Sequence, residues 1–226
     1  MSATRSAYGW VLPASDRHFA KYLSTSPKVE GRRMYQPQHI EQTLQFCRLR
    51  RRAVDVGAHV GFRSYYLALA FARVEAFEPS ELFAQCFERN VRAKAVTLHR
   101  VALGEAQGEI ALEVDAENTG ATHVRPGAQE GAQKLPMRRL DDYALEEVDL
   151  VKIDVEGYER RVLEGGRDTL ARCRPVVIVE QKDFAGRFGD GRYAASQLLQ
   201  SLGAVQLAQV VQDFIFGWPG SDALGG

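Results

Sequence analysis

The sequence lacks any long apolar run. Its 226 residues contain no stretch that approaches the roughly 20 apolar residues that a membrane-spanning helix needs. The first residues, MSATRSAYGWVLPASDRHF, also lack the continuous apolar core of a secretory signal. We therefore expect a soluble protein with no membrane partner that is not exported and resides in the cytoplasm.

Cysteine is scarce and net charge is absent. The three cysteines, Cys47, Cys86 and Cys173, lie far apart without Cys-x-x-Cys spacing, which argues against a disulfide framework and against a zinc site. Lysine plus arginine and aspartate plus glutamate both number 29, so the formal charge is zero. The basic excess that drives binding to phosphate backbones is missing, and duplex nucleic acid is not an expected partner.

From residue 53 onward, short β-type runs alternate with helical stretches. This alternation predicts an α/β fold in which helices cover a mostly parallel sheet. We expect one domain over residues 51–226, preceded by an N-terminal helical extension over residues 1–50 that covers the substrate side. The predicted strands span residues 53–56, 74–77, 96–98, 150–153, 175–179, 205–211 and 213–218, and the predicted helices span residues 38–48, 62–71, 80–91, 158–171 and 193–202.

The helical period disappears between residues 104 and 139. Alternating segments at residues 109–114 and 135–139 predict a β-hairpin insertion, with a loop around residues 120–131. We expect this insertion to lie on the substrate side of the domain.

A strand that runs into a glycine-containing turn begins at residue 54. The segment VDVGAHVG places Asp55 at the strand end and Gly57 and Gly61 in the turn. Glycine permits tight backbone angles and close approach, and the following helix offers unpaired N–H groups to a ligand. The spacing differs from the Gly-x-Gly-x-x-Gly loop of dinucleotide binders, and Asp55 would repel a pyrophosphate. The turn therefore favours a cofactor that carries an amino acid and no phosphate.

An acidic residue ends the second predicted strand. Glu78, in Phe77-Glu78-Pro79, follows Asp55 by 23 residues. In Rossmann-type sheets, an acid about 20 residues past the glycine turn accepts hydrogen bonds from ribose hydroxyls. Either motif alone is weak, but together they predict a nucleoside-bearing cofactor.

These segments resemble the FkbM-type methyltransferases, a family named for macrolide O-methylation. The resemblance runs from about Ala53 to Lys182 and is carried by AVDVGAHVGF, AFEPS, VALG, the segment LDD at residues 140–142, RPVVIVE and above all VKIDVEGYERRVLEGG at residues 151–166. It implies a Rossmann-like, seven-stranded methyltransferase sheet that is mostly parallel with an antiparallel C-terminal hairpin, and S-adenosyl-L-methionine as the cofactor. The cofactor-binding residues expected from the motifs and the resemblance together are Asp55, Gly57, Ala58, His59, Gly61, Glu78, Pro79, Ala102 and Asp154, with His59 where the family commonly has asparagine.

Several acids follow the later strands, where a methyl acceptor would bind. Asp154 and Glu156 are two residues apart, so an extended backbone would send both side chains to the same side, and Glu180 could complete the cluster. Such a cluster suits a general base or a bound divalent cation such as Mg²⁺, which is not the favoured alternative. Structural alternatives are that Asp154 caps a helix or pairs with Lys152, and that Glu159 forms surface ion pairs.

Histidines are further candidates for removing a proton from the acceptor. His123 lies in the insertion, and its ordinary pKa near neutrality suits proton removal. His39, in the N-terminal helix, could close over the pocket. A histidine in a loop is, however, more often simply exposed to solvent. The candidates for catalysis are therefore Asp154, Glu156, Glu180 and His123.

The leading functional hypothesis is O-methylation of a hydroxyl on a sugar, glycan or small metabolite; the acceptor class comes from the resemblance alone. The alternatives are N-methylation of a nucleotide or other small acceptor, and a non-catalytic binding module with the same fold. The sequence does not determine the oligomeric state.

Overall fold

A seven-stranded sheet forms the centre of the computed structural model, which describes residues 3–125 and 134–224. Its strand order is β14-β15-β13-β12-β5-β6-β7, and within this sheet β15 alone runs in the direction opposite to the other strands. This arrangement confirms the predicted fold class. The strands are β5 (Arg52–Val56), β6 (Arg73–Phe77), β7 (Val96–His99), β12 (Val148–Ile153), β13 (Val176–Glu180), β14 (Val205–Val210) and β15 (Asp213–Gly217).

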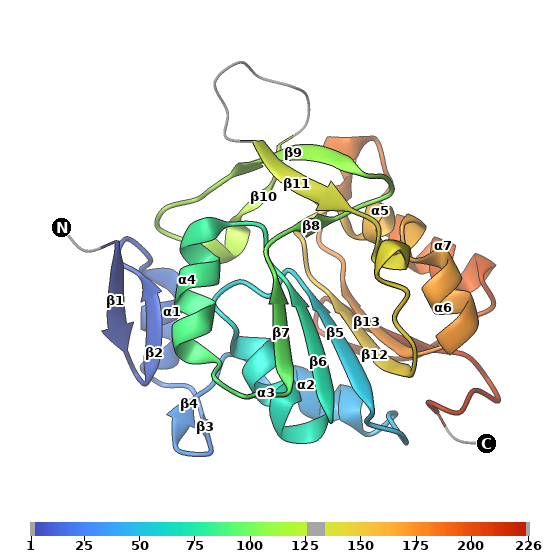
Figure 1. Ribbon diagram of the computed structural model, residues 1–226, viewed down its shortest axis with the longest axis horizontal. Coiled ribbons are helices and arrows are strands. Elements are labelled where there is room, and N and C mark those ends of the chain that lie inside the picture. Colours follow the sequence, from blue (N-terminus) through green and yellow to red (C-terminus); the bar gives the residue numbers. More distant parts are fainter. Residues whose placement is uncertain (1–2, 126–133, 225–226) are drawn as a thin grey trace.

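Helices cover both faces of this sheet (Figure 1). Alternate side chains of a strand point to opposite faces, and so Leu150 packs with α2 and α3 whereas Val151 packs with α5, α6 and α7. Because both faces are covered, β12 is buried along its whole length. The helices are α2 (Pro37–Leu44), α3 (Phe62–Ala70), α4 (Glu81–Asn90), α5 (Glu159–Glu164), α6 (Arg167–Cys173) and α7 (Ala194–Ser201). Among residues 3–125 and 134–224, no helix is both long and apolar enough to cross a membrane.

The single helix expected over residues 158–171 is wrong, because Gly165 and Gly166 separate α5 from α6. A side chain on Gly165 would place its Cβ only 1.9 Å from the carbonyl oxygen of Gly104, so the chain approaches a neighbouring backbone at this point. The side chain of Asp141 then starts α6 by accepting hydrogen bonds from the backbone N–H groups of Asp168 and Thr169 at 3.1 and 2.8 Å.

The predicted insertion forms a second, smaller sheet. Its order is β10-β9-β11-β8, and Leu135 lies opposite Ile110 in the antiparallel pair β9–β11, as the hairpin prediction requires. Figure 1 shows this sheet above the ends of β5, β6 and β7. Residues 126–131 of the predicted loop lie outside the described residues. The elements are β8 (Ala102–Leu103), β9 (Gly108–Glu113), β10 (His123–Val124), β11 (Lys134–Arg138) and the short 3₁₀ helices η1 (Thr119–Ala121), η2 (Leu140–Tyr143) and, farther on, η3 (Ala185–Phe188).

The N-terminal extension contains more than the helix expected at residues 38–48. Two β-hairpins precede that helix, which is α2, and the description of the extension as helical is incomplete for this reason. The side chain of Asn90 fastens the first hairpin by accepting from the N–H of Val11 at 2.7 Å and donating to the carbonyl oxygens of Val11 and Val60, both at 2.8 Å. The elements are β1 (Thr4–Ala7), β2 (Trp10–Pro13), α1 (His18–Leu23), β3 (Lys28–Val29) and β4 (Arg32–Arg33).

We predict that Gly165→Ala destabilises the protein by about 1–3 kcal/mol, because the new methyl group must displace the backbone at Gly104. Thermal unfolding measures the effect as a fall in Tm of roughly 2–4 °C for each kcal/mol. Gly186→Ala is the matched control, since a Cβ there meets nothing within 4 Å. Equal Tm values for the two variants would contradict the prediction.

Candidate functional site

A cavity of about 460 Å³ lies at the carboxyl ends of the central strands, where open α/β sheets bind ligands. Its volume falls within the range of small-molecule and cofactor sites. The ends of β5, β6, β12 and β13 form its floor, and residues of the N-terminal extension and of the small sheet form further walls. Ten of the twelve sequence-predicted site residues line it: Gly57, Ala58, His59, Glu78, Pro79, Ala102, His123, Asp154, Glu156 and Glu180.

The turn after β5 is held close to two neighbouring strands. Gly57 has a φ of +75°, and a Cβ on it would lie 2.0 Å from the carbonyl oxygen of Asp154. The backbone N–H groups of Gly57 and Ala58 donate to the carbonyl oxygen of Phe77 at 3.1 and 3.0 Å. Only glycine therefore fits this position, as the motif predicts.

Glu78 lies at the tip of β6 and is 5% exposed. Its carboxylate accepts hydrogen bonds from the backbone N–H groups of His59 at 2.9 Å and Ser80 at 2.8 Å. Burial raises the pKa of Glu78 to about 7, although these two donors oppose the shift. Each carboxylate oxygen keeps a further acceptor site, because a carboxylate offers about four lone-pair directions in all.

Asp55 and Gly61 do not line the cavity, although the sequence predicts cofactor contacts for both. Asp55 is completely buried and accepts a hydrogen bond from the hydroxyl of Ser64 at 2.6 Å. Gly61 has a φ of +96°, and a Cβ there would lie 2.6 Å from the Val91 side chain. Both residues support the turn from behind, by charge pairing and by close helix packing.

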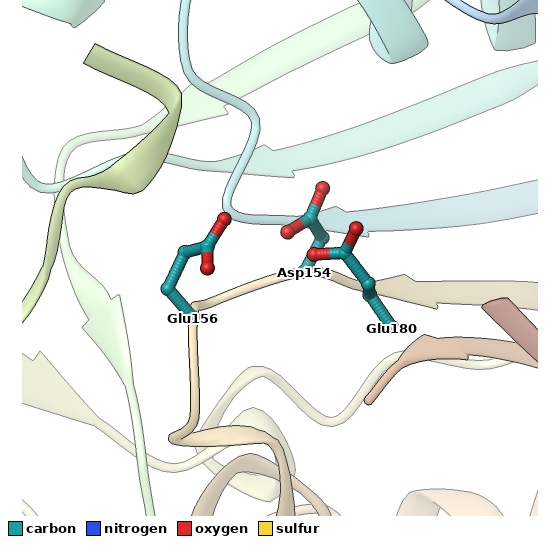
Figure 2. A group of neighbouring side chains, drawn as sticks. All are labelled: Asp154, Glu156 and Glu180. Carbon is teal, nitrogen blue, oxygen red and sulfur yellow. The ribbon is translucent and has the colours of Figure 1, made fainter. Parts of the chain in front are cut away.

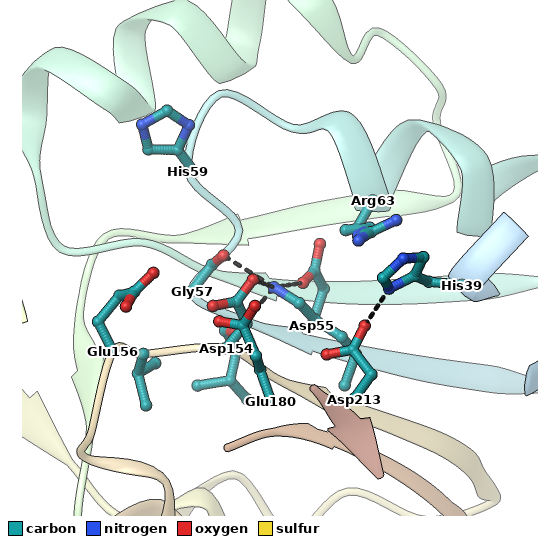
Figure 3. A network of polar contacts seen from close by, with 12 residues as sticks. His39, Asp55, Gly57, His59, Arg63, Asp154, Glu156, Glu180 and Asp213 are labelled. Carbon is teal, nitrogen blue, oxygen red and sulfur yellow. Dashed lines mark hydrogen bonds and ion pairs between the residues drawn. The ribbon is translucent and has the colours of Figure 1, made fainter. Parts of the chain in front are cut away.

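Lys152 belongs to the site, although the sequence predicts it only as an alternative partner of Asp154. Its buried ammonium lies 3.1 Å from the Asp55 carboxylate and 3.8 Å from that of Asp154, and donates to the carbonyl oxygens of Val56 and Gly57 at 3.2 and 3.0 Å (Figure 3). Burial lowers the pKa of Lys152, but the two carboxylates outweigh it and the pKa is raised. A lysine inside an otherwise apolar strand was the available signal, since lysine is almost never fully buried unless it is paired.

The predicted acid cluster is present. Oxygen atoms of Asp154, Glu156 and Glu180 lie within 4.8 Å of one another (Figure 2). The prediction that an extended backbone brings Asp154 and Glu156 to the same side is wrong, because Glu156 has a φ of +54°, in the left-handed region. Lys182 also joins the cluster: its ammonium lies 2.7 Å from the carboxylates of both Glu156 and Glu180. A local positive charge thus already lies beside two of the three acids.

The acids of the cluster differ in their protonation. Burial and the charge of Asp154 raise the pKa of Glu180 above its usual range, although Lys182 opposes the shift, and the two acids are hydrogen-bonded to each other. Burial also opposes ionisation of Asp154, but Lys152 and Lys182 together lower its pKa. Burial raises the pKa of Glu156, whose Oε2 has no hydrogen-bond partner among the described residues.

The histidine candidates lie in different settings. His123 lines the cavity from β10, and its Nδ1 lies 3.0 Å from the carbonyl oxygen of Ala121. His39 is buried in α2, lines the cavity and hydrogen-bonds to Asp213. Glu159 is not a surface ion pair: it is buried, and it accepts hydrogen bonds from the backbone N–H groups of Val155 and Gly157 at 3.3 and 2.8 Å. Glu159 therefore supports the loop after β12.

Aromatic rings from the extension form one wall of the cavity. The Phe19 ring lies 4.9 Å from that of Tyr35, 5.1 Å from that of Phe62 and 5.2 Å from that of His59, measured between centroids. The carboxylate of Asp16 fixes this wall by accepting from the N–H of Phe19 at 2.9 Å and from the hydroxyl of Thr119 at 2.6 Å. The extension and the insertion are thereby joined over the cavity.

Two solved structures share this fold at low sequence identity. A methyltransferase FkbM from Methylobacillus flagellatus KT is 18% identical with a TM-score of 0.53, and the match covers 74% of this chain and 43% of that one. A precorrin-6y C5,15-methyltransferase from Geobacter metallireducens GS-15 is 16% identical with a TM-score of 0.51, over 88% of this chain and 94% of that one. The chain thus spans less than half the length of the Methylobacillus protein.

Sequence comparison identifies the family. The protein named Methyltransferase 1 from Beauveria bassiana (strain ARSEF 2860) is 26% identical over 179 residues, which cover 66% of this chain and 70% of that protein. The model of the methyltransferase FkbM domain matches residues 55–210, which is more than half of the chain. The chain therefore belongs to the FkbM family of methyltransferases.

Proposed function

We propose that this protein is an S-adenosyl-L-methionine-dependent O-methyltransferase that acts on a hydroxyl of a sugar, glycan or small metabolite. One observation carries the proposal: the turn after β5, the acid at the tip of β6 and the acid cluster after β12 and β13 all line a single cavity. A nucleoside-binding half and a proton-handling half thus meet in one space. Membership of a methyltransferase family supports the reaction class.

The residues present fit the cofactor. Glu78 combines a buried carboxylate with unused acceptor positions, which suits the hydroxyls of a ribose. The turn residues Gly57–His59 line the same cavity, and Gly57 packs against the carbonyl oxygen of Asp154 so closely that a Cβ on it would lie 2.0 Å from that oxygen. Pro79, Phe83 and Ala102 supply apolar surface in the same cavity. When bound, S-adenosyl-L-methionine supplies an electrophilic methyl group on a sulfonium.

The acid cluster forms the acceptor half of the proposed site. Asp154 and Glu180 are hydrogen-bonded to each other, and their remaining oxygen lone pairs can accept a hydrogen bond from an acceptor hydroxyl. The ammonium of Lys182, 2.7 Å from Glu180, supplies a donor beside them, so this group of side chains can orient a hydroxyl near the methyl group. Asp154, Glu156, Glu180 and His123 remain the predicted groups for binding the acceptor and moving its proton.

We predict that Glu78→Gln weakens binding of S-adenosylhomocysteine about 10-fold to 100-fold, the range expected when a hydrogen bond to a charged group is lost. Isothermal titration calorimetry measures the affinity. Glu75→Gln is the matched control on the same strand, because Glu75 pairs with His99 at 2.9 Å and does not line the cavity. Failure of the wild-type protein to bind either form of the cofactor would overturn the proposed function.

The same titration at different pH values tests the ionisation of Glu78. Only its carboxylate form accepts hydrogen bonds from both ribose hydroxyls, and burial raises its pKa to about 7 in the free protein. Affinity is therefore full above pH 7 and falls roughly tenfold for each pH unit below it. Glu75→Gln is expected to keep this dependence and Glu78→Gln to lose it. A flat profile in the wild-type protein would contradict this role.

The acceptor class is tested with methyl-labelled cofactor and separate glycan, nucleoside and peptide pools. We expect the label in the glycan pool, on oxygen. We also expect the transfer to survive chelation with EDTA, because Lys182 already lies 2.7 Å from both Glu156 and Glu180. Label confined to the nucleoside pool would favour N-methylation of a nucleotide, and loss of transfer with EDTA would show that the cluster binds a cation.

A further inference from the structure

A buried histidine–aspartate pair lies at the edge of the acceptor half. Nδ1 of His39 lies 2.5 Å from Oδ2 of Asp213, and both side chains are almost fully buried. His39 belongs to α2 in the N-terminal extension, and Asp213 begins β15. Both residues lie outside the segment 55–210 that matches the FkbM domain. The pair is therefore contributed by the two flanks of the family domain.

Strand register places this pair next to the acid cluster. Asp213 is the direct partner of Glu180 in the antiparallel ladder between β13 and β15. Directly opposite residues have Cβ atoms about 4.5–5.5 Å apart and point to the same face of the sheet. Both His39 and Asp213 also line the cavity. Figure 3 shows their bond at the same end of the sheet as Asp154 and Glu180.

The hydrogen bond fixes the chemistry of the imidazole. A carboxylate can only accept, so Nδ1 of His39 donates a proton to Asp213. In the neutral ring this leaves Nε2 as the unprotonated nitrogen. Within the described residues Nε2 makes no hydrogen bond, although the ring is buried and lines the cavity. The ring thus keeps an oriented lone pair on Nε2 that has no hydrogen-bond partner in the part of the chain that the structure describes.

The acids of the cluster are less suited to take a proton. Glu180 and Asp154 are hydrogen-bonded to each other, and two lysines stabilise the ionised form of Asp154. Glu156 shares its Oε1 with Lys182 at 2.7 Å, and its Oε2 is enclosed by protein. Each of the three acids is thus already engaged by a neighbouring acid or lysine, so the cluster is suited to bind the acceptor.

We infer that His39, oriented by Asp213, is the catalytic base that removes the proton of the acceptor hydroxyl. The inference rests on the proposed methyl transfer. The hydroxyl proton moves to Nε2, and the O–H electron pair stays on oxygen and forms the bond to the methyl carbon. The electron pair of the broken sulfur–carbon bond remains on sulfur. The positive charge lost by the sulfonium is then carried by the imidazolium, beside the carboxylate of Asp213.

The first test needs no acceptor. Nitrogen-15 NMR of the wild-type protein, assigned by loss of the signal in His39→Gln, reports which ring nitrogen carries the proton. We expect a protonated Nδ1 and an unprotonated Nε2, and a mixture of the two tautomers in Asp213→Asn. A proton on Nε2 in the wild-type protein would overturn the inference even if no acceptor pool is labelled.

The second test measures methyl transfer from labelled cofactor to the glycan pool. We expect His39→Gln to lower the rate about 100-fold or more, which is typical of a lost general base, while affinity for S-adenosylhomocysteine changes less than twofold. His99→Gln is the matched control. His99, in β7, pairs with Glu75 of β6 at 2.9 Å and does not line the cavity. The rate of this control is expected to stay within twofold of the wild type.

The outcomes separate this inference from the proposed function. Absence of cofactor binding in the wild-type protein would overturn both. Cofactor binding with undiminished transfer by His39→Gln would overturn the inference alone. Tm is measured for each variant. If His39→Gln does not fold, the transfer rate of Asp213→Asn and the tautomer of His39 in the wild-type protein test the inference instead. A purely structural pair would lower Tm in both variants without affecting the transfer rate of the folded fraction.

Discussion

The buried ammonium of Lys152 is the interaction on which the site depends. Removing a charge from water costs several kcal/mol, and the cost is offset only if partners surround the charge. Here two carboxylates and two backbone carbonyl oxygens do so, and they come from β5, from the turn that follows it and from the end of β12. The same four contacts that stabilise the charge also fix the geometry of the turn. The floor of the cavity is therefore set before any ligand arrives.

This arrangement explains why two motif residues act at a distance from the ligand. Asp55 neutralises Lys152 below the turn, and Gly61 allows α3 to begin against α4. Neither needs to touch a cofactor for the motif to be required. A sequence pattern records which residue types a local structure demands, but it does not distinguish contact with a ligand from support of the residues that make the contact.

The sequence was sufficient for the sheet and for the positions of the acids. Periodicity and turn signals located the strands, because β12 and β13 are buried on both faces and read as continuous apolar runs. It was not sufficient for the break at Gly165, which depends on a backbone more than 50 residues earlier in the chain. It also missed the hairpins of the extension and the place of Lys182 between Glu156 and Glu180, since both depend on contacts between distant segments.

Buried hydrogen bonds hold the N-terminal extension against the rest of the domain on one side of the cavity. The carboxamide of Asn90 holds the first hairpin against the turn at Val60, and Asp16 joins α1 to the insertion at Thr119. Opening that side would break several buried hydrogen bonds at once. Val211, in the turn between β14 and β15, lines the same cavity and is 75% exposed. At this C-terminal hairpin the cavity is therefore bordered by a side chain that lies largely in solvent, whereas the hydrogen bonds of Asn90 and Asp16 hold the extension in place.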